Sequence, residues 1–135
     1  DDKAIQLLML HGWRVIDALA LSEDILPYRN HILSSRGEFT VAKEQYTCLH
    51  TGWFSDRSAC YLAAGRPVIT QETGFSKFLP TGRGLFGFKT MEDILTAVDK
   101  IESDYERSCR AARDIAIEYF AADKVLNSLV EKVGL

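Results

Sequence analysis

One stretch decides the fold: His50-Thr-Gly-Trp-Phe-Ser-Asp-Arg-Ser-Ala-Cys-Tyr-Leu-Ala-Ala-Gly-Arg-Pro-Val-Ile69. It predicts a polar loop, a helix from about Ser55 to Ala64, a stop at Gly65 and a short buried strand over 67–70. The proline after that glycine cannot continue the helix. A loop that runs into a helix presents free backbone N–H groups and the positive end of the helix dipole. The stretch therefore predicts a site for an anion such as phosphate.

Length, composition and charge indicate how many domains to expect and which classes of partner to exclude. The chain has 135 residues, of which 47% are hydrophobic and 26% charged, and its net charge is -3. This length predicts one domain, and the charge gives no reason to expect nucleic acid as a partner. The sequence has no apolar run of the roughly 20 residues that a membrane span needs, and no leader pattern follows Asp1. Three cysteines without a Cys-x-x-Cys pair predict a reduced, cytoplasmic chain without a bound metal.

Predicted strands alternate with predicted helices, which favours an α/β fold with a parallel sheet covered by helices on both faces. A capping box, Ser103-Asp-Tyr-Glu106, predicts where one helix starts, and the last helix is expected to turn its apolar side inward. The predicted strands are 13–17, 39–42, 67–70 and 85–88. The predicted helices are 3–10, 24–35, 55–64, 90–101, 103–120 and 123–132, with one helical turn at 75–79, and 43–53 is predicted to be irregular. The inward positions of the last helix are Val125, Leu126, Leu129, Val130 and Val133.

Ligands of parallel sheets bind outside the carboxyl ends of the strands. The loops after Ala42, Ile69 and Phe88 are therefore expected to meet at one edge. Lys43 would place a cation there, and His50 could donate to a phosphate or act as an acid or base. A solvated lysine and a structural loop histidine are the alternatives for these two residues.

The residues around the predicted helix start are the main candidates for binding. Gly52 permits close backbone approach, and Trp53 could stack on a base or a sugar. Ser55 could cap the helix or donate to a phosphate oxygen, and Arg57 could bind phosphate through two nitrogens. Alternatively, Ser55 and Asp56 only start a helix, and Arg57 is a solvated charge. Ser58 completes the first helical turn and belongs to the same set.

A second group of candidates follows the buried strand, in Gln71-Glu-Thr-Gly74. Glu72 could accept hydrogen bonds from ligand hydroxyls, and the amides of Thr73 and Gly74 could hold an anion. A plain turn is the alternative here. The loop Thr81-Gly-Arg-Gly84 is also basic and glycine-rich, but a simple surface turn is the better explanation for it.

The segment from Gly52-Trp-Phe-Ser to Ala-Ala-Gly65-Arg-Pro-Val resembles the donor-binding half of GT-B glycosyltransferases. The family pattern is Glu-Gly-Phe-Gly, four variable residues, then Glu-Ala-Met-Ala-Ala-Gly-x-Pro-Val. Arg57 is similar to a variant seen in spore-maturation-type members of group 1. The resemblance covers about residues 37–133. The two carboxylates of the pattern fall on Gly52 and Cys60 here, so Asp56 or Glu72 would have to replace them.

This resemblance implies a single Rossmann-like domain over 1–135 that binds a nucleoside-diphosphate sugar for glycosyl transfer. It implies that helix N–H groups near Ser55–Ser58, with Arg57 and Lys43, would stabilise the diphosphate without a metal or other cofactor. The acceptor-binding N-terminal half would lie outside the chain and be its partner, so we expect weak donor binding and no turnover by the chain alone. The catalytic residues stay unassigned.

Two other interpretations stay open. One is a non-catalytic module that binds a nucleotide or phosphate, which the residues at Gly52 and Cys60 favour. The other is a receiver-type signalling domain, which needs an acidic cluster at the strand ends, where only Asp17 fits.

Overall fold

The structure, a computed structural model, describes residues 2–134. The chain divides into a smaller unit that ends at His31 and a larger unit that begins at Ile32. The smaller unit contains α1 (Asp2–Leu10), α2 (Ala18–Ser22) and the first part of α3 (Ile25–Ser34). The Asp17 side chain starts α2 by accepting hydrogen bonds from the N–H groups of Leu19 and Ala20. No described side chain of this unit is buried.

The larger unit contains the sheet and the helices around it. In chain order it consists of β1 (Glu38–Thr40), α4 (Glu44–Cys48), α5 (Asp56–Ala63), β2 (Val68–Gln71), the 3-10 helix η1 (Phe75–Lys77), β3 (Leu85–Phe88), α6 (Met91–Ser103), α7 (Tyr105–Tyr119) and α8 (Ala122–Val133). The three strands form one parallel sheet in the order β1-β2-β3. The chain is therefore an α/β protein with a small parallel sheet.

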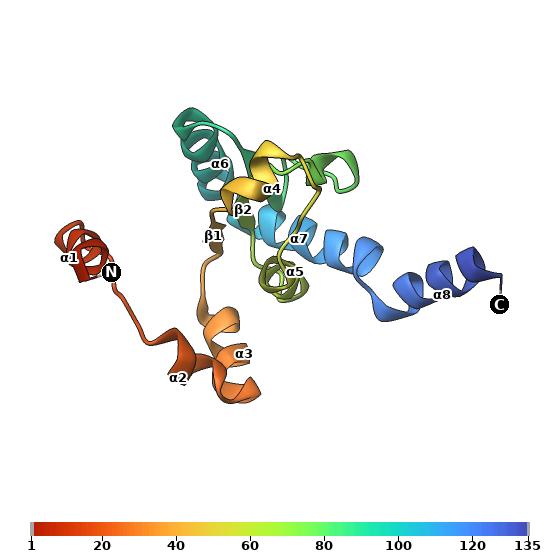
Figure 1. Cartoon of the computed structure of the whole chain (residues 1–135), viewed down its shortest axis with the longest axis horizontal. Helices are drawn as coiled ribbons and strands as arrows, with labels where there is room; N and C mark the ends of the chain where they lie inside the picture. The colour runs from red at the N-terminus through yellow and green to blue at the C-terminus, as the bar shows by residue number, and fades with distance from the viewer. Residues whose placement is uncertain (1, 135) are drawn as a thin grey trace. The chain divides into compact units, whose positions relative to one another are not determined.

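Helices cover both faces of this sheet. Ile69 of β2 and Phe86 of β3 are register partners and pack with Ala97 and Ile101 of α6 in one buried cluster. Glu38 and Thr40 alternate with Phe39 along β1, and both are held by an arginine of α5. Because alternate residues of a strand point to opposite faces, α5 and α6 cover opposite faces. Figure 1 shows the strands between these two helices.

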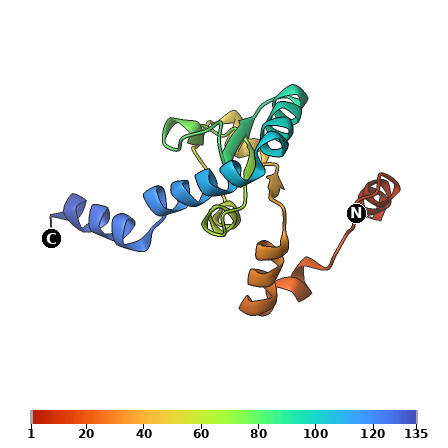
Figure 2. The ribbon, with the colours of Figure 1, turned by 180° about the vertical axis from the view of Figure 1, so that it is seen from behind.

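The helix α7 packs closely on the start of β3 and on α5. It buries Ala112, Ile115 and Ala116. A Cβ atom placed on Gly84, just before β3, would overlap the backbone of Ala112, and the φ of this glycine is +71°. Figure 2 shows α7 in front of the sheet from the side opposite to Figure 1. Glycine at 84 thus allows β3 and α7 to approach each other.

The structure corrects several sequence predictions in the smaller unit and between the strands. Residues 13–17 form no strand and are exposed, because an extended segment becomes a strand only when another strand pairs with it. The predicted irregular segment 43–53 contains the five-residue helix α4, which is too short to leave a periodic pattern. The helices predicted over 3–10 and 24–35 are confirmed within a residue.

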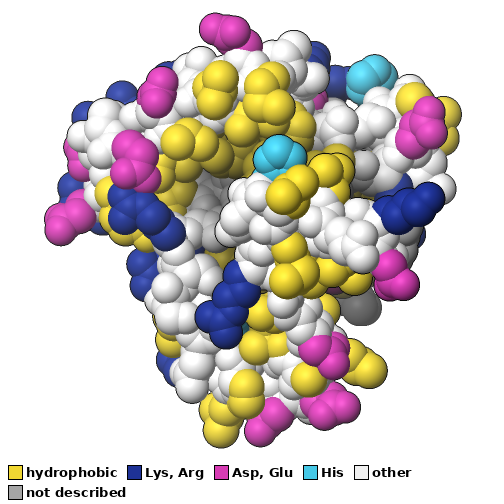
Figure 3. Space-filling model, turned by 90° about the vertical axis from the view of Figure 1, so that its left-hand side faces the viewer, with side chains coloured by type: hydrophobic (Ala, Val, Ile, Leu, Met, Phe, Trp, Pro, Cys, Tyr) yellow, Lys and Arg dark blue, Asp and Glu magenta, His cyan; other side chains and the backbone are white. Residues whose placement is uncertain are grey.

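Two predictions about the last helices were wrong. Asp104 caps α7 through a hydrogen bond from the N–H of Arg107, and Ser103 is the last residue of α6. The apolar side of α8 is not inward, because Leu126 and Leu129 are each 57% exposed. Other large apolar side chains are also exposed, and Figure 3 shows one face with such groups in yellow between charged ones.

Candidate functional site

The carboxyl ends of the three strands place the predicted site at one edge of the larger unit. β1 ends at Thr40, β2 at Gln71 and β3 at Phe88, and all three strands run in the same direction. The N–H of Ala42 donates to Oε1 of Gln71 at 3.2 Å, which ties the segment after β1 to the end of β2. Since α5 runs back toward the other edge, its first turn lies at this edge as well.

Two loops of this edge are joined by short hydrogen bonds. The N–H of Gly52 donates to the carbonyl of Thr73 at 2.8 Å, and Oγ1 of Thr73 donates to the carbonyl of Trp53 at 2.6 Å. Gly74 has a φ of +101°, and a Cβ on it would lie 3.0 Å from the carbonyl oxygen of His50. The structure thus brings together the predicted candidates of the 50–53 and 72–74 segments, and Thr73 and Gly74 are buried there.

The start of α5 follows the first of these loops directly, and its N-cap side chain is not used as a cap. Ser55 is the N-cap residue, but its side chain makes no cap hydrogen bond. The N–H groups of a first helical turn have no carbonyl partner in their own helix. The side chain of Asp56 is exposed, whereas Ser58 is fully buried and its hydroxyl has no partner within residues 2–134.

Arg57 points from α5 to β1. Its Nε donates to Oε1 of Glu38 at 2.5 Å, and its Nη2 donates to Oγ1 of Thr40 at 2.7 Å. The Glu38 side chain is 5% exposed and that of Arg57 is 50% exposed. The guanidinium therefore holds a buried carboxylate of the neighbouring strand, and this pairing accounts for an acidic residue inside a strand.

Glu72 folds back over its own turn. Its Oε1 accepts a hydrogen bond from the N–H of Gly74 at 2.5 Å. Its Oε2 lies 3.0 Å from the position that a Cβ on Gly87 would occupy. One carboxylate oxygen is thus used by the turn, while the other lies against β3, and Glu72 itself is partly exposed.

The remaining candidates lie at the rim of the site. The ring of Trp53 stacks on Tyr46 of α4, with centroids 4.8 Å apart and planes 5° from parallel. Lys43 is the exposed N-cap residue of α4 and has no ion pair within the described part of the chain. His50 is exposed and has a φ of +48°, in the left-handed region that residues other than glycine seldom adopt.

Sequence reasoning missed two residues that contact the candidates: Glu38, which begins β1 and binds Arg57, and Tyr46, which stacks on Trp53. The signal for Glu38 was present, because a carboxylate between Gly37 and Phe39 at a strand start calls for a cation. Tyr46 gave no such signal, since its stacking on Trp53 depends on a helix too short to predict.

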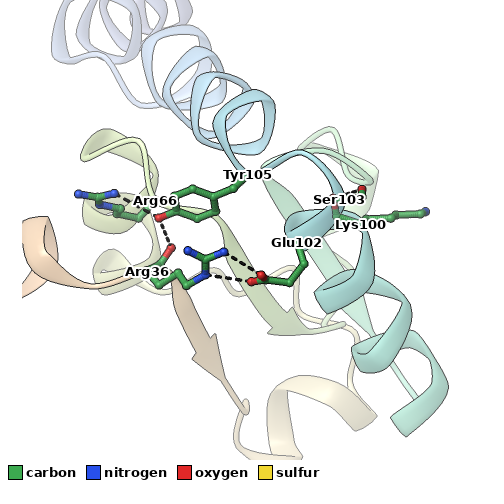
Figure 4. Close-up of polar contacts among 6 residues, drawn as sticks. All are labelled: Arg36, Arg66, Lys100, Glu102, Ser103 and Tyr105. Carbon is green, nitrogen blue, oxygen red and sulfur yellow. Dashed lines mark hydrogen bonds and ion pairs between the residues drawn. The ribbon is translucent and has the colours of Figure 1, made fainter.

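A second polar cluster fastens the opposite, amino edge of the sheet, and it is structural. Arg36 donates two hydrogen bonds to Glu102, at 2.9 and 2.8 Å, and lies 4.2 Å above the ring of Tyr105 (Figure 4). These bonds raise the pKa of Arg36 and lower that of Glu102. Tyr105 donates to the carbonyl of Arg36 at 2.6 Å and accepts from Arg66, and burial raises its pKa.

Within residues 2–134, no three His, Cys, Asp or Glu side chains lie close enough to hold a metal ion. No helix in that range is both long and apolar enough to cross a bilayer. No family model, curated protein or solved structure matches the chain. The carboxyl edge of the sheet, with the motif it contains, is therefore the feature from which a function can be inferred.

Proposed function

We propose that this chain is the donor-binding part of a GT-B glycosyltransferase, with a Rossmann-like domain that binds a nucleoside-diphosphate sugar. The observation that carries the proposal is the start of α5. Ser55 occupies the N-cap position without using its hydroxyl as a cap, at the carboxyl edge of a parallel sheet. This combination is what a diphosphate needs, because helix amides and a hydroxyl can then donate to its oxygens.

The diphosphate would lie over the first turn of α5. Its oxygens would accept hydrogen bonds from the N–H groups of that turn and from the Ser55 hydroxyl. Lys43, exposed on the same edge, would add a positive charge. Tyr46 covers one face of the Trp53 ring, so a base or sugar would stack on the ring's other face.

Arg57 and Glu72 have narrower roles in this proposal. Arg57 is a positioning residue, since its hydrogen bonds to Glu38 and Thr40 fix the start of α5 against β1. Asp56 is exposed, and Glu72 has one oxygen outside its turn hydrogen bond. These two carboxylates would accept hydrogen bonds from ribose or sugar hydroxyls in place of the family residues that Gly52 and Cys60 replace.

Calorimetry with UDP, GDP and their sugars tests the proposal. We expect one of these nucleotides to bind and the variant Ser55→Ala to bind it about tenfold more weakly, the effect of losing one hydrogen bond to a charged group. Ser76→Ala is the control, because Ser76 is an exposed serine that lies in η1 rather than at the start of α5. The proposal is overturned if no nucleotide binds at millimolar concentration, or if the two serine variants bind equally.

A non-catalytic module that binds a nucleotide or phosphate is the second candidate. It is favoured by Gly52 and Cys60 at the positions of the family carboxylates and by the engagement of Arg57 with Glu38. Release of nucleoside diphosphate from UDP- and GDP-sugars by the full-length protein separates the two candidates. Binding without release supports the module, whereas release that falls in Asp56→Asn or Glu72→Gln supports the transferase.

A further inference from the structure

A pocket of about 340 Å³ lies at the amino edge of the sheet, away from the site proposed above. It is formed by the Gly82–Arg83 turn before β3, the end of α6 and the start of α7. Since α6 follows the carboxyl end of β3 and runs back, its last turn lies at the opposite edge. The volume is at the lower end of the range for small-molecule pockets, about 300–1,000 Å³.

The lining of this pocket is strongly basic. Arg83, Lys100 and Arg107 contribute three positive charges, against one negative charge from Asp104. The lining thus carries a net charge of +2, in a chain whose net charge is -3. None of the three cations has a carboxylate within 4.0 Å in the part of the chain that the structure describes. In Figure 4, Lys100 extends away from the Arg36–Glu102 pair.

Arg107 lies at a position where its own helix, α7, does not favour a positive charge. It lies in the first turn of that helix, where its own N–H donates to the Asp104 cap at 3.1 Å. The helix dipole disfavours a cation in a first turn. Lys100, in the last turn of α6, is where the dipole favours a cation. An anion between them would offset the unfavourable position of Arg107.

Ser108 adds a hydroxyl group to the basic lining. The residue lines the same pocket and is 6% exposed, so little of it other than its pocket-facing surface can meet solvent. Hydroxyl groups donate hydrogen bonds to phosphate oxygens as well as to water. A group that accepts hydrogen bonds and carries negative charge would therefore match both the hydroxyl and the three cations.

We propose that this pocket binds the phosphate group of a small phosphorylated compound. The guanidinium groups of Arg83 and Arg107 supply paired N–H donors for phosphate oxygens. Lys100 supplies a third charge, and Ser108 supplies a hydroxyl donor. The site is separate from the diphosphate site at α5, so one can exist without the other.

An amide NMR titration of the whole chain with inorganic phosphate and with pyrophosphate tests this proposal. We expect saturable shifts at Gly82, Ser103 and Ser108, with affinity at least tenfold lower in Arg107→Gln. Arg110→Gln is the matched control, because Arg110 is exposed on the same helix and pairs with Glu106 at 3.6 Å. Lys100→Gln, at an exposed position, gives the same comparison if Arg107→Gln does not fold.

The outcomes are distinct. Shifts that never saturate, or equal weakening in Arg107→Gln and Arg110→Gln, overturn the pocket. Binding to phosphatidate vesicles without binding to free phosphate overturns it too, since the proposal is for a small soluble compound. The variant Ser55→Ala should leave the shifts at Gly82, Ser103 and Ser108 unchanged, and shifts caused by UDP or GDP should instead involve Gly52 and Gly74. The two proposals therefore fail separately.

Discussion

The pair formed by Glu38 and Arg57 is the clearest case in which one side chain stabilises another, because the Arg57 guanidinium is the counter-charge of a buried carboxylate. The Glu38 side chain is 5% exposed, and one of its oxygens has no partner in the described residues. Removing the guanidinium leaves the carboxylate buried without a counter-charge. We expect Arg57→Ala to lower the free energy of unfolding by about 2 kcal/mol, as measured by urea denaturation.

Arg110→Ala is the control for this measurement, because its ion pair with Glu106 is exposed. Such pairs contribute little, so the change should stay below about 0.5 kcal/mol. Adding Glu38→Gln to Arg57→Ala should recover part of the loss, since a neutral amide needs no counter-charge. Equal effects of the two alanine substitutions would contradict the assignment.

Asp93 gives a prediction with a definite pH dependence. The N–H groups of Lys89 and Thr90 both donate to Oδ2 of Asp93, at 2.9 Å, and they lower the pKa of this carboxyl below the usual 3.8. The stabilisation is therefore complete above that value and is lost as pH falls through the lower, folded-state pKa.

The variant Asp93→Asn should accordingly be less stable than the parent at pH 7, and this difference should shrink as pH falls below 3.8. Urea unfolding at several pH values measures it. Glu92→Gln is the control, because its carboxylate, in the same turn, accepts no hydrogen bond from the described residues. A deficit for Asp93→Asn that stays constant down to pH 2 would refute the explanation.

For single residues, the sequence predicted which segments meet at the carboxyl edge, but it did not predict which side chains form hydrogen bonds with each other. The contact between the 50–53 and 72–74 segments follows from the rule that parallel strands end at one edge. The partner of Arg57 did not follow, because nothing local relates it to Glu38, 19 positions earlier. The burial of Ser58 was also not foreseen, since the loop pattern does not say which side of α5 faces the sheet.

At the scale of elements, the contact between β3 and α7 depends on Gly84. A Cβ there would lie 2.7 Å from the carbonyl carbon of Ala111 and 2.8 Å from Cα of Ala112, and φ is +71°. Backbone cannot move as a side-chain end can, so we expect Gly84→Ala to cost about 3 kcal/mol or more.

Gly82→Ala separates the overlap from backbone strain. Gly82 has a φ of +96°, and a Cβ on it would meet no atom within 4 Å. This variant should cost only about 1–2 kcal/mol, the strain of a left-handed residue. Thermal and urea denaturation of both variants check the difference. Similar losses would mean that β3 and α7 are not held as closely as the structure has them.

The elements of the larger unit that were predicted correctly are those whose ends the sequence marks. The helix over 55–64 and the strands at 67–70 and 85–88 were bounded by glycine, proline or a cap, and each is confirmed within about two residues. The segment 13–17 and the helix α8 show the opposite case. Their patterns predict an apolar side, but whether that side finds a partner depends on the rest of the molecule.

At the scale of the whole molecule, the sequence predicted the fold class from the alternation of strands and helices. The structure has a three-stranded parallel sheet covered on both faces. The sequence could not predict the division between His31 and Ile32. No glycine- or proline-rich linker marks this division, and α3 runs across it. A single domain over the whole chain stays a prediction.

The same division predicts two levels of stability within one chain. The nine-residue helix α1 has no buried side chain, and isolated helices below about 12–15 residues are marginal in water. The N–H groups of Val68 and Glu72 lie instead in the sheet, where they donate to Gly84 and Phe88 at 2.9 Å. Amide hydrogen exchange should therefore give α1 an opening free energy below about 1 kcal/mol.

Val68 and Glu72 should exchange only through unfolding of the larger unit, and their exchange should follow its urea stability. The comparison needs no variant, since both regions are measured in the same sample. Protection of α1 equal to that of Val68 would mean that the smaller unit is stabilised by contacts that bury its apolar side chains. In that case the residues up to His31 would have to be treated as part of one cooperative domain.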